Sequence, residues 1–379
     1  MTVAGHELTR RNFHAVNRVN TINSQTNTIA KPLLNWFDRH GRKDLPWQKN
    51  RTPYRVWLSE IMLQQTQVKT VIPYFQRFTR RFPSLKSLAC APLDDVLGHW
   101  AGLGYYARAR NLHKAAVQIH QEHGGRFPRD LDALIALPGI GRSTAGAILA
   151  QALEQRHPIL DGNVKRVLTR YYAIEGWPDT RQVLEQLWEI SNNNTPKQRV
   201  RDYTQAIMDL GATVCTRTNP GCAQCPLATQ CRAKELDLTN QLPTPKPKKR
   251  IPVRQTRMLM LIDPSGTRIY MEKRPPSGIW GGLLSFPETN LDQSTKDWVS
   301  QRLRHKIKNE HNLPVLRHTF SHFHLDIHPI VAQISEFGDH VMEPTGLVWY
   351  KPTALESRGI AAPVRHLLAQ LKQIMGEQK

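Results

Sequence analysis

The sequence predicts two folded parts: a mainly α-helical domain with a glycine-rich hairpin and a cysteine-rich loop, then a smaller α+β domain. Three observations support this prediction. The chain has 379 residues, more than one ordinary hydrophobic core accommodates. Apolar residues recur at helical spacing across residues 29–235, whereas short apolar strands follow residue 256. Between these parts, the segment NQLPTPKPKKRIPVRQT contains four prolines, which exclude a helix.

The helical domain contains one clear helix start. Thr52 can accept a free N–H group of the first turn, Pro53 suits the first helical position, and apolar residues follow at helical spacing to about residue 70. Glycine-rich breaks separate several later segments, for example at Gly124 and Gly125. We therefore expect helices over residues 54–70, 84–98, 106–122, 129–136, 143–155, 161–174, 181–191 and 199–212.

The rest of the chain divides into a tail, a linker and a domain with strands. Residues 236–256 form a Pro/Lys-rich linker of extended character. Strands at 257–263, 268–273 and 348–350 and an amphipathic helix at 362–374 then build an α+β domain over residues 257–379. Residues 1–28 are polar and weakly basic. We interpret them as a disordered tail that touches DNA, and a transit peptide is the alternative.

The net charge of the chain is strongly positive. Its 52 Lys and Arg residues outnumber 31 Asp and Glu residues, which leaves +21. Such a surplus repels itself unless an anionic partner offsets it, and nucleic acid is the usual partner. A membrane surface is the alternative, but no uninterrupted apolar run is long enough to span a bilayer. Because the sequence also opens without a secretion signal, we expect a cytoplasmic protein.

Four of the five cysteines crowd into one short segment. Cys215, Cys222, Cys225 and Cys231 are separated by six, two and five residues, while Cys90 stands apart as a predicted core residue. This crowding argues against a disulfide framework and for a metal site in a reducing compartment. Four thiolates bind either zinc or an iron–sulfur cluster, and the spacing alone does not separate the two.

Residues 137–148, LPGIGRSTAGAI, have the pattern of a tight hairpin between two helices. Gly139 and Gly141 permit a sharp turn, and Ser143 or Thr144 starts the next helix. The free N–H groups at that helix start would stabilise an anion. The segment resembles a helix–hairpin–helix motif, which implies the binding of one DNA phosphate without reading the base sequence. An ordinary helix corner with packing glycines is the alternative, because two glycines alone are a weak signal.

Two carboxylates are candidates for acid chemistry. Glu60 in VWLSEIMLQQTQV lies mid-helix beside Trp57, Ile61 and Leu63, where burial would raise its pKa. Asp161 in ILDGNVKRV lies where a helix begins, so it caps that helix, stabilises a cation as an ionised group, or does both. Cleavage of a glycosidic bond needs such an acid and a nearby carboxylate. An ordinary surface glutamate is the alternative for Glu60.

In combination these motifs resemble the endonuclease III/MutY family of helix–hairpin–helix DNA glycosylases, and the adenine-excising MutY branch is similar over about residues 30–376. The resemblance implies that the four clustered cysteines bind a [4Fe–4S] cluster, which shapes a DNA-contacting loop and takes no part in base removal. It also implies that Glu60 protonates adenine N7 and that Asp161 stabilises the oxocarbenium ion. Arg42 in GRKDLPW and Asn163 match further active-site positions of the family.

Ser143 distinguishes two related activities. Bifunctional endonuclease III types carry a lysine at this position, and its amine attacks the sugar. Serine cannot form that Schiff base, so we predict a monofunctional glycosylase that uses water. The rival interpretations are an endonuclease III-like enzyme for oxidised pyrimidines and a non-catalytic iron–sulfur protein that binds DNA.

The resemblance also predicts the substrate, which is adenine opposite 8-oxoguanine or guanine in double-stranded DNA. A monomer in the bacterial cytoplasm, associated with the nucleoid, would flip the adenine out of the helix. Gln64 and Gln65 would fill the gap, and Tyr105 in GLGYYARARNL would wedge beside the 8-oxoguanine. Arg108 and Arg110 would bind phosphates.

The C-terminal domain resembles a Nudix fold through RPPSGIWGGLLSFP at 274–287. It lacks the run of glutamates that binds Mg²⁺ in Nudix hydrolases, so nucleotide hydrolysis is not expected. In HTFSHFHLDIHPI, alternation predicts a strand with Phe320, His322 and His324 on one face, and a metal site at the two histidines is a lesser alternative. The resemblance instead makes Phe320, Ser321 and His322 a loop in which Ser321 hydrogen-bonds 8-oxoguanine.

Overall fold

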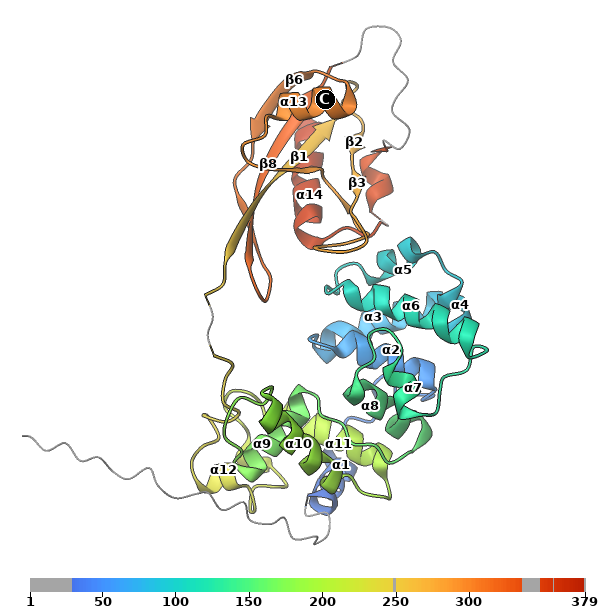
Figure 1. Ribbon diagram of the computed structural model, residues 1–379, viewed down its shortest axis with the longest axis vertical. Coiled ribbons are helices and arrows are strands. Elements are labelled where there is room, and N and C mark those ends of the chain that lie inside the picture. The colour runs from blue at the N-terminus through green and yellow to red at the C-terminus, as the bar shows by residue number, and fades with distance from the viewer. Residues whose placement is uncertain (1–28, 248–249, 336–347, 357, 378–379) are drawn as a thin grey trace, which may run out of the picture.

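The computed structural model of the protein describes residues 29–247, 250–335, 348–356 and 358–377. A helical part and an α+β part follow each other along the chain, and Figure 1 shows the α+β part at the top. The predicted fold class is confirmed. The expected N-terminal tail, residues 1–28, lies outside the described residues. Across the described ranges, no helix combines the length and the apolar character needed to cross a membrane.

The helical part is a succession of short helices around two hydrophobic clusters. Thr52 Oγ1 accepts the Arg55 N–H and Pro53 is the first residue of α2, as predicted. One cluster joins the helices from α2 to α8, and the other joins α1 to α9, α10 and α11. The elements are α1 (Ala30–His40), α2 (Pro53–Leu63), α3 (Val68–Arg81), α4 (Leu85–Ala89), α5 (Leu93–Trp100), α6 (Ala107–Glu122), α7 (Leu131–Ile135), α8 (Arg142–Leu153), α9 (Gly162–Tyr172), α10 (Arg181–Asn194), α11 (Val200–Thr213), η1 (Cys222–Gln224) and α12 (Arg232–Glu235).

Some predicted helix boundaries are wrong. Residues 54–70 do not form one helix, because Gln65 adopts a left-handed conformation with a φ of 58° between α2 and α3. Residues 84–98 split into α4 and α5 at Pro92, since a proline ring cannot continue the interior of a helix. The sequence prediction also omits α1, although its buried residues Leu33, Trp36 and Phe37 follow helical spacing.

The α+β part is built on a mixed sheet of order β6-β8-β1-β2-β9, with β5 beside β1 and β7 beside β8. β1 runs parallel to β8, from Val253 opposite His324 to Ile262 opposite Gln333. Residues 253–256 therefore belong to a strand and not to the predicted linker. The strands are β1 (Val253–Ile262), β2 (Ile269–Tyr270), β3 (Glu272–Lys273), β4 (Leu284–Ser285), β5 (Glu288–Thr289), β6 (Ile307–Asn312), β7 (Leu316–Thr319), β8 (His324–Ile334) and β9 (Trp349–Tyr350); β3 and β4 pair separately.

Both faces of β1 are buried over its second half, residues 258–262, which explains the run of apolar residues there. Met258 and Met260 share a hydrophobic cluster with α14 (Ala362–Glu377). Leu259 and Leu261 share another cluster with α13 (Thr295–Leu303). Because successive strand residues point to opposite faces, the two helices cover opposite sides of the sheet. A short 3₁₀ helix, η2 (Pro352–Leu355), follows β9.

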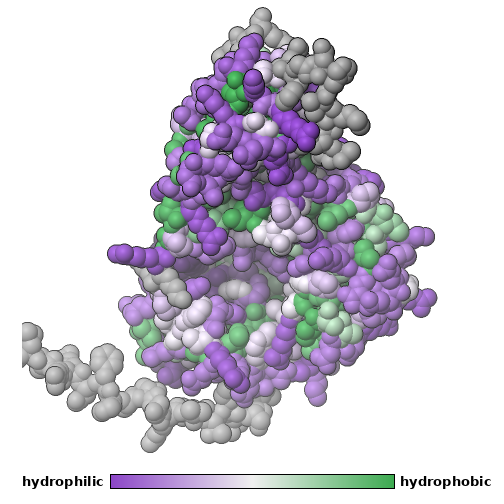
Figure 2. Space-filling model, turned by 45° about the horizontal axis from the view of Figure 1, so that its top comes forward, coloured by the Kyte–Doolittle hydropathy of each residue, from purple (hydrophilic) through white to green (hydrophobic). Residues whose placement is uncertain are grey.

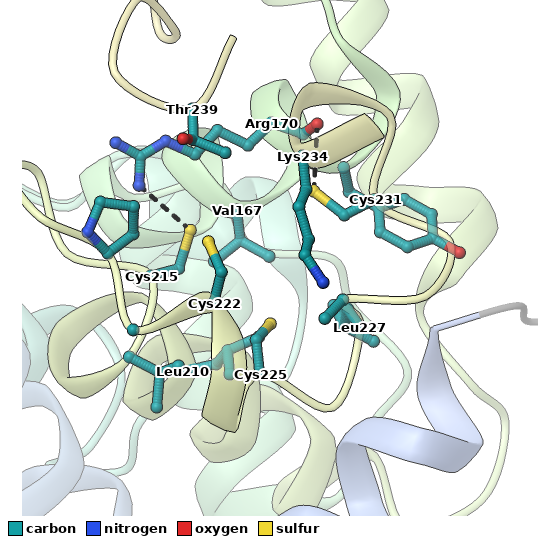
Figure 3. A pocket seen from close by; sticks show the side chains of 15 residues that line it. Val167, Arg170, Leu210, Cys215, Cys222, Cys225, Leu227, Cys231, Lys234 and Thr239 are labelled. Carbon is teal, nitrogen blue, oxygen red and sulfur yellow. Dashed lines mark hydrogen bonds between the residues drawn. The ribbon is translucent and has the colours of Figure 1, made fainter. Parts of the chain in front are cut away.

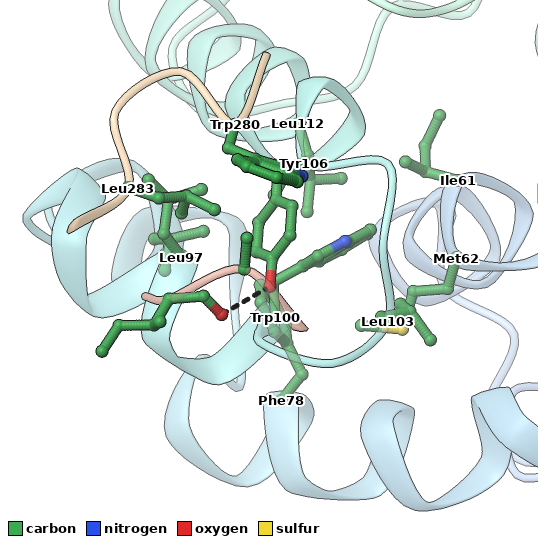
Figure 4. Packing of buried hydrophobic residues seen from close by; sticks show 14 of the residues in the cluster. Ile61, Met62, Phe78, Leu97, Trp100, Leu103, Tyr106, Leu112, Trp280 and Leu283 are labelled. Atoms are coloured by element: carbon green, nitrogen blue, oxygen red, sulfur yellow. Dashed lines mark hydrogen bonds between the residues drawn. The ribbon is translucent and has the colours of Figure 1, made fainter. Parts of the chain in front are cut away.

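The two parts share one hydrophobic core. Trp100 and Tyr106 of the helical part pack in the same cluster as Trp280 and Leu283 of the α+β part (Figure 4). The Tyr106 hydroxyl donates a hydrogen bond to the Ile360 carbonyl at 3.2 Å. The orientation of the α+β part on α5 and α6 is therefore fixed by packing and not by the linker alone.

Candidate active site

Glu60 lies near the C-terminal end of α2, facing α8. Its neighbours Trp57 and Ile61 are buried, and Glu60 itself is half-buried. Gln151 of α8 donates its Nε2–H to Glu60 Oε1 at 3.1 Å. Burial, and after it the negative charge of Asp161, raise the pKa of Glu60 to about 7. Glu60 can therefore hold a proton near neutral pH, as a general acid must.

Asp161 caps the N-terminus of α9. Its Oδ1 accepts the Val164 N–H at 2.8 Å, and its Oδ2 accepts the Asn163 Nδ2–H at 3.1 Å. Burial raises the pKa of Asp161, and these donors oppose the rise because they stabilise the charged form. Two negative charges so close repel each other, so a proton on one of the two carboxylates is favoured. Glu60 accepts fewer hydrogen bonds than Asp161, so its charged form is less stabilised and the proton resides on Glu60. The fold thus brings the two predicted carboxylates close enough for the charge of Asp161 to raise the pKa of Glu60.

A glycine sets the distance between α9 and α11 beside this pair. A Cβ atom at Gly211 would lie 2.6 Å from Asn163 Cβ and 2.9 Å from the Asn163 carbonyl oxygen. The two helices therefore touch backbone to backbone. Arg166 bridges the same place, because its guanidinium donates to Asn163 Oδ1 at 2.9 Å, the Gly211 carbonyl at 2.6 Å and the Cys215 carbonyl at 2.7 Å. One arginine links the residue beside Asp161 to the start of the cysteine loop.

Arg42, a predicted catalytic residue, is paired with a buried carboxylate. Its backbone N–H donates to Asp209 Oδ2 at 2.8 Å and its Nη2 donates to Asp209 Oδ1 at 2.6 Å. Gln205 also donates to Asp209 Oδ1, at 2.8 Å. Asp209 is only 1% exposed, so Arg42 compensates a charge that would otherwise be costly to bury. A part for Arg42 in catalysis stays a prediction.

The helix–hairpin–helix turn joins α7 to α8. Gly139 has a φ of 79°, which favours glycine, and Gly141 is the N-cap of α8, so this helix starts one residue earlier than predicted. Ser143 Oγ accepts the Leu160 N–H at 3.0 Å. The hairpin helix is therefore tied to the chain directly before Asp161.

Gln64 and Gln65 form the turn between α2 and α3, close to the hairpin. Gln64 Nε2 lies 3.5 Å from Thr144 Oγ1, at the limit of a hydrogen bond. Gln65 is exposed and left-handed. Both glutamines thus stand at the end of the helix that contains Glu60, with the Gln65 side chain open to a ligand.

A second site lies between the helical and the α+β parts. Tyr105, which is 53% exposed, lines a pocket together with residues 320–322 and Trp280. Residues 320–322 form a turn between β7 and β8, because the Phe320 N–H donates to the Phe323 carbonyl at 2.9 Å. The strand interpretation of these residues is wrong, and the structure has the loop that the family resemblance implied. Figure 2 shows a deep recess between the α+β part at the top and the helices below.

The arginines that follow Tyr105 serve the fold. Arg108 is buried and donates to three carbonyls at the C-terminal end of α2, at 2.6 to 2.9 Å, where a helix leaves its last carbonyls unpaired. Arg110 donates to the Gly281 carbonyl of the α+β part at 2.7 Å. The expectation that both bind phosphates is therefore wrong for Arg108, and Arg110 joins the two parts beside Trp280.

The four clustered cysteines line one pocket (Figure 3). Arg170, which is 2% exposed, approaches Cys215 Sγ with Nη1 at 3.4 Å and donates to the carbonyls of Thr216 and Arg217 at 2.6 and 3.0 Å. Burial raises the pKa of Cys225 to about 11, so this thiol is protonated at neutral pH unless a bound cation replaces its proton. The pocket lining includes the thiols and apolar side chains: Cys215, Cys222, Cys225, Cys231, Val167, Leu210 and Leu227.

Zinc and an iron–sulfur cluster place different demands on the spacing of four thiols. Within the described residues, no three His, Cys, Asp or Glu side chains are placed to hold a metal ion, the two histidines at 322 and 324 included. A tetrahedral zinc site with Zn–S bonds of about 2.3 Å needs sulfurs about 3.8 Å apart. An iron–sulfur cluster is larger, so its thiolates stand further apart around a pocket. The four cysteines around this pocket are the residues that could hold either group.

Several residues that build the site have no motif in the sequence. Gln151 and Asp209 are polar residues of helices whose neighbours are apolar, and that contrast is the available signal, whereas Arg166 follows Lys165 and has no such signal. Gln48 is 9% exposed, and neither of its amide atoms has a hydrogen-bond partner in the described structure. A buried amide without a partner marks a place for a ligand or a water molecule. The prediction for Cys90 is wrong, because it is exposed.

Known proteins resemble both parts of the chain. A family model described as HhH-GPD superfamily base excision DNA repair protein matches residues 58–193, and a NUDIX domain model matches residues 257–370. The adenine DNA glycosylase of Buchnera aphidicola subsp. Acyrthosiphon pisum (strain APS) is 40% identical over 345 residues, which cover 91% of this chain and 98% of that protein. The adenine DNA glycosylase of Homo sapiens is 35% identical, covering 77% of this chain and 64% of its own. The structure of a thermostable thymine-DNA glycosylase is 26% identical with a TM-score of 0.51, over 55% of this chain and 95% of that one.

The helical part is thus that of a base excision DNA repair protein of the helix–hairpin–helix class. The NUDIX match alone would allow a nucleotide hydrolase, but the identity to glycosylases extends over nearly the whole chain. The chain belongs to the adenine DNA glycosylase family.

Proposed function

We propose that the protein is a monofunctional glycosylase that hydrolyses the N-glycosidic bond of adenine opposite 8-oxoguanine or guanine in double-stranded DNA. One observation supports this most: Glu60, with its pKa raised to about 7, lies within electrostatic reach of the second carboxylate, Asp161. A proton donor beside a carboxylate is what the cleavage of a glycosidic bond requires.

Bond cleavage moves one proton and one electron pair. Glu60 gives its proton to adenine N7, so the electron pair of the C1′–N9 bond leaves with a neutral base. The positive charge that develops on the sugar is stabilised by the carboxylate of Asp161. Water then adds to C1′ and gives a proton back to Glu60, which restores the acid. Asn163 holds Asp161 in place through the hydrogen bond of 3.1 Å.

Ser143 confines the reaction to hydrolysis. A lysine at this position could replace water as the nucleophile and open a route to strand cleavage. Ser143 has no amine, and its Oγ accepts the Leu160 N–H at 3.0 Å. The product is therefore an intact strand with an abasic site.

Recognition of the opposite base belongs to the pocket between the two parts. The exposed ring of Tyr105 can stack on a base, and the exposed Ser321 hydroxyl can hydrogen-bond its edge. In this scheme residues 29–235 perform excision, residues 257–379 contribute lesion recognition, and residues 236–256 join them. Phe320 and His322 hold the Ser321 loop against Trp280 and Phe323 through ring contacts of 4.7 to 5.6 Å.

The charge and the surface of the chain suit double-stranded DNA. The net charge of +21 favours phosphate binding, and Gly139 and Gly141 leave the N-terminus of α8 open to one phosphate. The recess in Figure 2 offers room between the two parts. We propose that the protein acts as a monomer on nucleoid DNA in the cytoplasm.

The cysteine loop would hold a [4Fe–4S] cluster through Cys215, Cys222, Cys225 and Cys231. When bound, the cluster supplies four iron–thiolate bonds that order the loop, while base removal stays with the two carboxylates. Arg170 anchors the loop independently through the carbonyl contacts already described. Iron and sulfide in the purified protein, with a broad visible absorption band, are expected. Zinc in their place would contradict the cluster.

The deciding experiment measures adenine release from a duplex with adenine opposite 8-oxoguanine, followed by strand analysis with and without alkali. Breaks that appear only after alkali indicate water as the nucleophile. The matched control is Glu60→Gln, which keeps the size of the side chain and removes the acid. We expect this variant to bind the duplex and release no base.

Three outcomes would contradict the proposal. Strand breaks without alkali would indicate a bifunctional enzyme. A preference for duplexes containing thymine glycol would favour an endonuclease III-like activity. Duplex binding without base release by the unaltered, iron-loaded protein would leave only a DNA-binding function.

A further inference from the structure

Gln151 is a buried polar side chain in a helix that is otherwise apolar on its inner face. It is 3% exposed, and the preceding α8 residues Ile148, Leu149 and Ala150 are fully buried. Its Nε2–H donates to Glu60 Oε1 at 3.1 Å, across the contact between α8 and α2. A buried amide is costly unless its polar atoms are paired, so a glutamine at this place indicates a specific task.

The backbone of Gln151 is held from a third helix. Arg201 of α11 donates Nε–H to the Gln151 carbonyl at 2.8 Å and pairs through Nη2 with Glu154 at 2.8 Å. α8 also packs against both α2 and α11. The fold therefore fixes where the Gln151 carboxamide stands relative to the Glu60 carboxyl.

A hydrogen bond to one carboxyl oxygen determines where the acidic proton resides. Oε1 of Glu60 accepts the amide hydrogen of Gln151, so the proton of the neutral acid is best placed on Oε2. The same bond restrains rotation of the carboxyl group. These restraints matter because a misplacement of about 1 Å can cost a catalytic step about 10²-fold.

We propose that Gln151 is a positioning residue for the acid step: it occupies Oε1 of Glu60, so that the transferable proton stays on Oε2 and is presented to the extruded base. This inference rests on the proposed function, in which Glu60 is the general acid. Gln151 touches no reacting atom and acts through Glu60 alone. Its hydrogen bond also favours the charged carboxyl, and so opposes the burial and the Asp161 charge that raise the pKa of Glu60.

Asp161 is the charged side chain that acts on the Glu60 carboxyl. Within the described residues, the loss of the Gln151 donor would therefore be opposed by no neighbouring cation. The other charged or titratable groups on the helices packed against α2 do not act on the Glu60 carboxyl. They are Arg108 of α6 on carbonyls of α2, Arg110 of α6 on the Gly281 carbonyl, His113 of α6 on the Ala91 carbonyl, the half-buried His120 and the exposed Lys114 and Glu122 of α6, Arg142 of α8 over Trp188, Arg77 of α3 over Tyr74, Arg81 of α3 on Asp95, and the exposed Lys69 and Arg80 of α3.

Gln151→Met tests the inference, because it keeps the length of the side chain and removes the donor. The plateau rate of adenine release in single turnover should fall about tenfold. The alkaline limb of the pH–rate profile should move to higher pH, because Glu60 then binds its proton more tightly. In Gln151→Glu, a donor exists only while the new carboxyl is protonated, so the rate should recover toward acid pH.

The matched control is Gln118→Met on α6. Gln118 also donates to a glutamate carboxylate, Glu122 at 2.9 Å, but on the exposed surface. This variant should keep both the rate and the pH profile. If Gln151→Met also kept them, the positioning role would be wrong. An equal loss of rate at every pH, with a lower melting temperature, would show that Gln151 only fills space and would overturn the inference too.

A second measurement does not depend on activity. The titration of the ¹³C-labelled Glu60 side chain can be followed by NMR in the free holoprotein, with Glu60→Gln to assign the signal. The pKa of Glu60 should be higher in Gln151→Met than in the unaltered protein. An unchanged titration overturns the role of Gln151 even if adenine is released. Absence of adenine release from the unaltered protein instead overturns the proposed function, so the two failures are distinguishable.

Discussion

The excision site and the pocket between the two parts are built in opposite ways. Glu60 and Asp161 are half-buried, and each carboxylate accepts hydrogen bonds from residues fixed on helices. Tyr105 and Ser321 are exposed and come from loops of different parts of the chain. In the proposed function, the first site acts on the same bond in any DNA, whereas the second adapts to the base that it meets. The difference leads us to expect that the chemistry depends on rigid helices and that discrimination depends on how the two parts meet.

The largest expected effect is on the excision site, in Asp161→Asn. Asparagine caps helices as well as aspartate, so stability should change by less than about 1 kcal/mol. Loss of the charge should lower the single-turnover rate of adenine release by roughly 100- to 1000-fold. Asp161→Ala is the comparison, since it should lose the cap as well as the rate. A rate within tenfold of the unaltered protein would show that the sugar cation is stabilised by another group.

The second prediction concerns how the ionisation of Glu60 affects the stability of the fold. Its pKa is raised from an ordinary value near 4.5 to about 7, so the fold binds this proton more tightly than the unfolded chain does. The free energy of unfolding should therefore fall as pH rises from about 4.5 to about 7. Glu60→Gln lacks this titration, and it should exceed the unaltered protein in stability by up to about 3 kcal/mol above pH 7 and match it near pH 4.

Chemical denaturation of both proteins across this pH range measures the difference. Ser321→Ala serves as the control from the exposed pocket and should show no such pH-dependent gain. Equal stability of Glu60→Gln and the unaltered protein at every pH would mean that ionised Glu60 does not destabilise the fold. In that respect the excision site would then not differ from the exposed pocket.

The third prediction addresses discrimination. Tyr105→Leu removes an aromatic ring that can stack on a base, an interaction worth about 1–3 kcal/mol. The preference for adenine opposite 8-oxoguanine over adenine opposite guanine should fall about tenfold, while the plateau rate with 8-oxoguanine changes little. The comparison is Tyr106→Phe, which keeps the buried ring and loses only the hydrogen bond of 3.2 Å to Ile360 between the two parts, so its preference should fall by no more than about threefold. A fall in plateau rate with unchanged preference would place Tyr105 in excision instead.

The smallest expected effect comes from the contact between the parts. Arg110 donates to the Gly281 carbonyl at 2.7 Å, next to Trp280, whose ring lies 5.6 Å from that of Phe320. Loss of one hydrogen bond costs about 0.5–1.5 kcal/mol, so Arg110→Ala should lower the preference for 8-oxoguanine about threefold. The preference is measured as the ratio of the binding affinities for two duplexes, which carry 8-oxoguanine or guanine opposite a non-cleavable adenine analogue. Arg110→Lys should restore part of the preference, and equal values for all three proteins would exclude the link.

The sequence was informative where a side chain has an unusual chemical task in a local pattern. Glu60 between apolar residues, Asp161 at a helix start and the four crowded cysteines can all be identified from short segments. Arg108 shows where such reading fails. Its position beside Tyr105 suggests phosphate binding, yet it donates to carbonyls of α2, which are more than forty residues away in the sequence.

Contacts between distant segments explain the other differences. The end of α2 is set by the conformation of Gln65, which no apolar periodicity reveals. Residues 253–256 become a strand only because β8 lies alongside them, about seventy residues later in the chain. Gln151 looks like an ordinary helical residue until the packing of α8 on α2 brings it to Glu60. Tertiary contacts of this kind are not encoded in any local window of the sequence.

Gly211 of α11 and Asn163 of α9 lie so close together that no side chain would fit at position 211. Any movement of α11 must therefore carry the first turn of α9 with it. Gly211 brings no side chain to this contact, so no change of rotamer at that residue can loosen it. The close contact therefore keeps Asp161, two residues before Asn163, at a constant distance from α11.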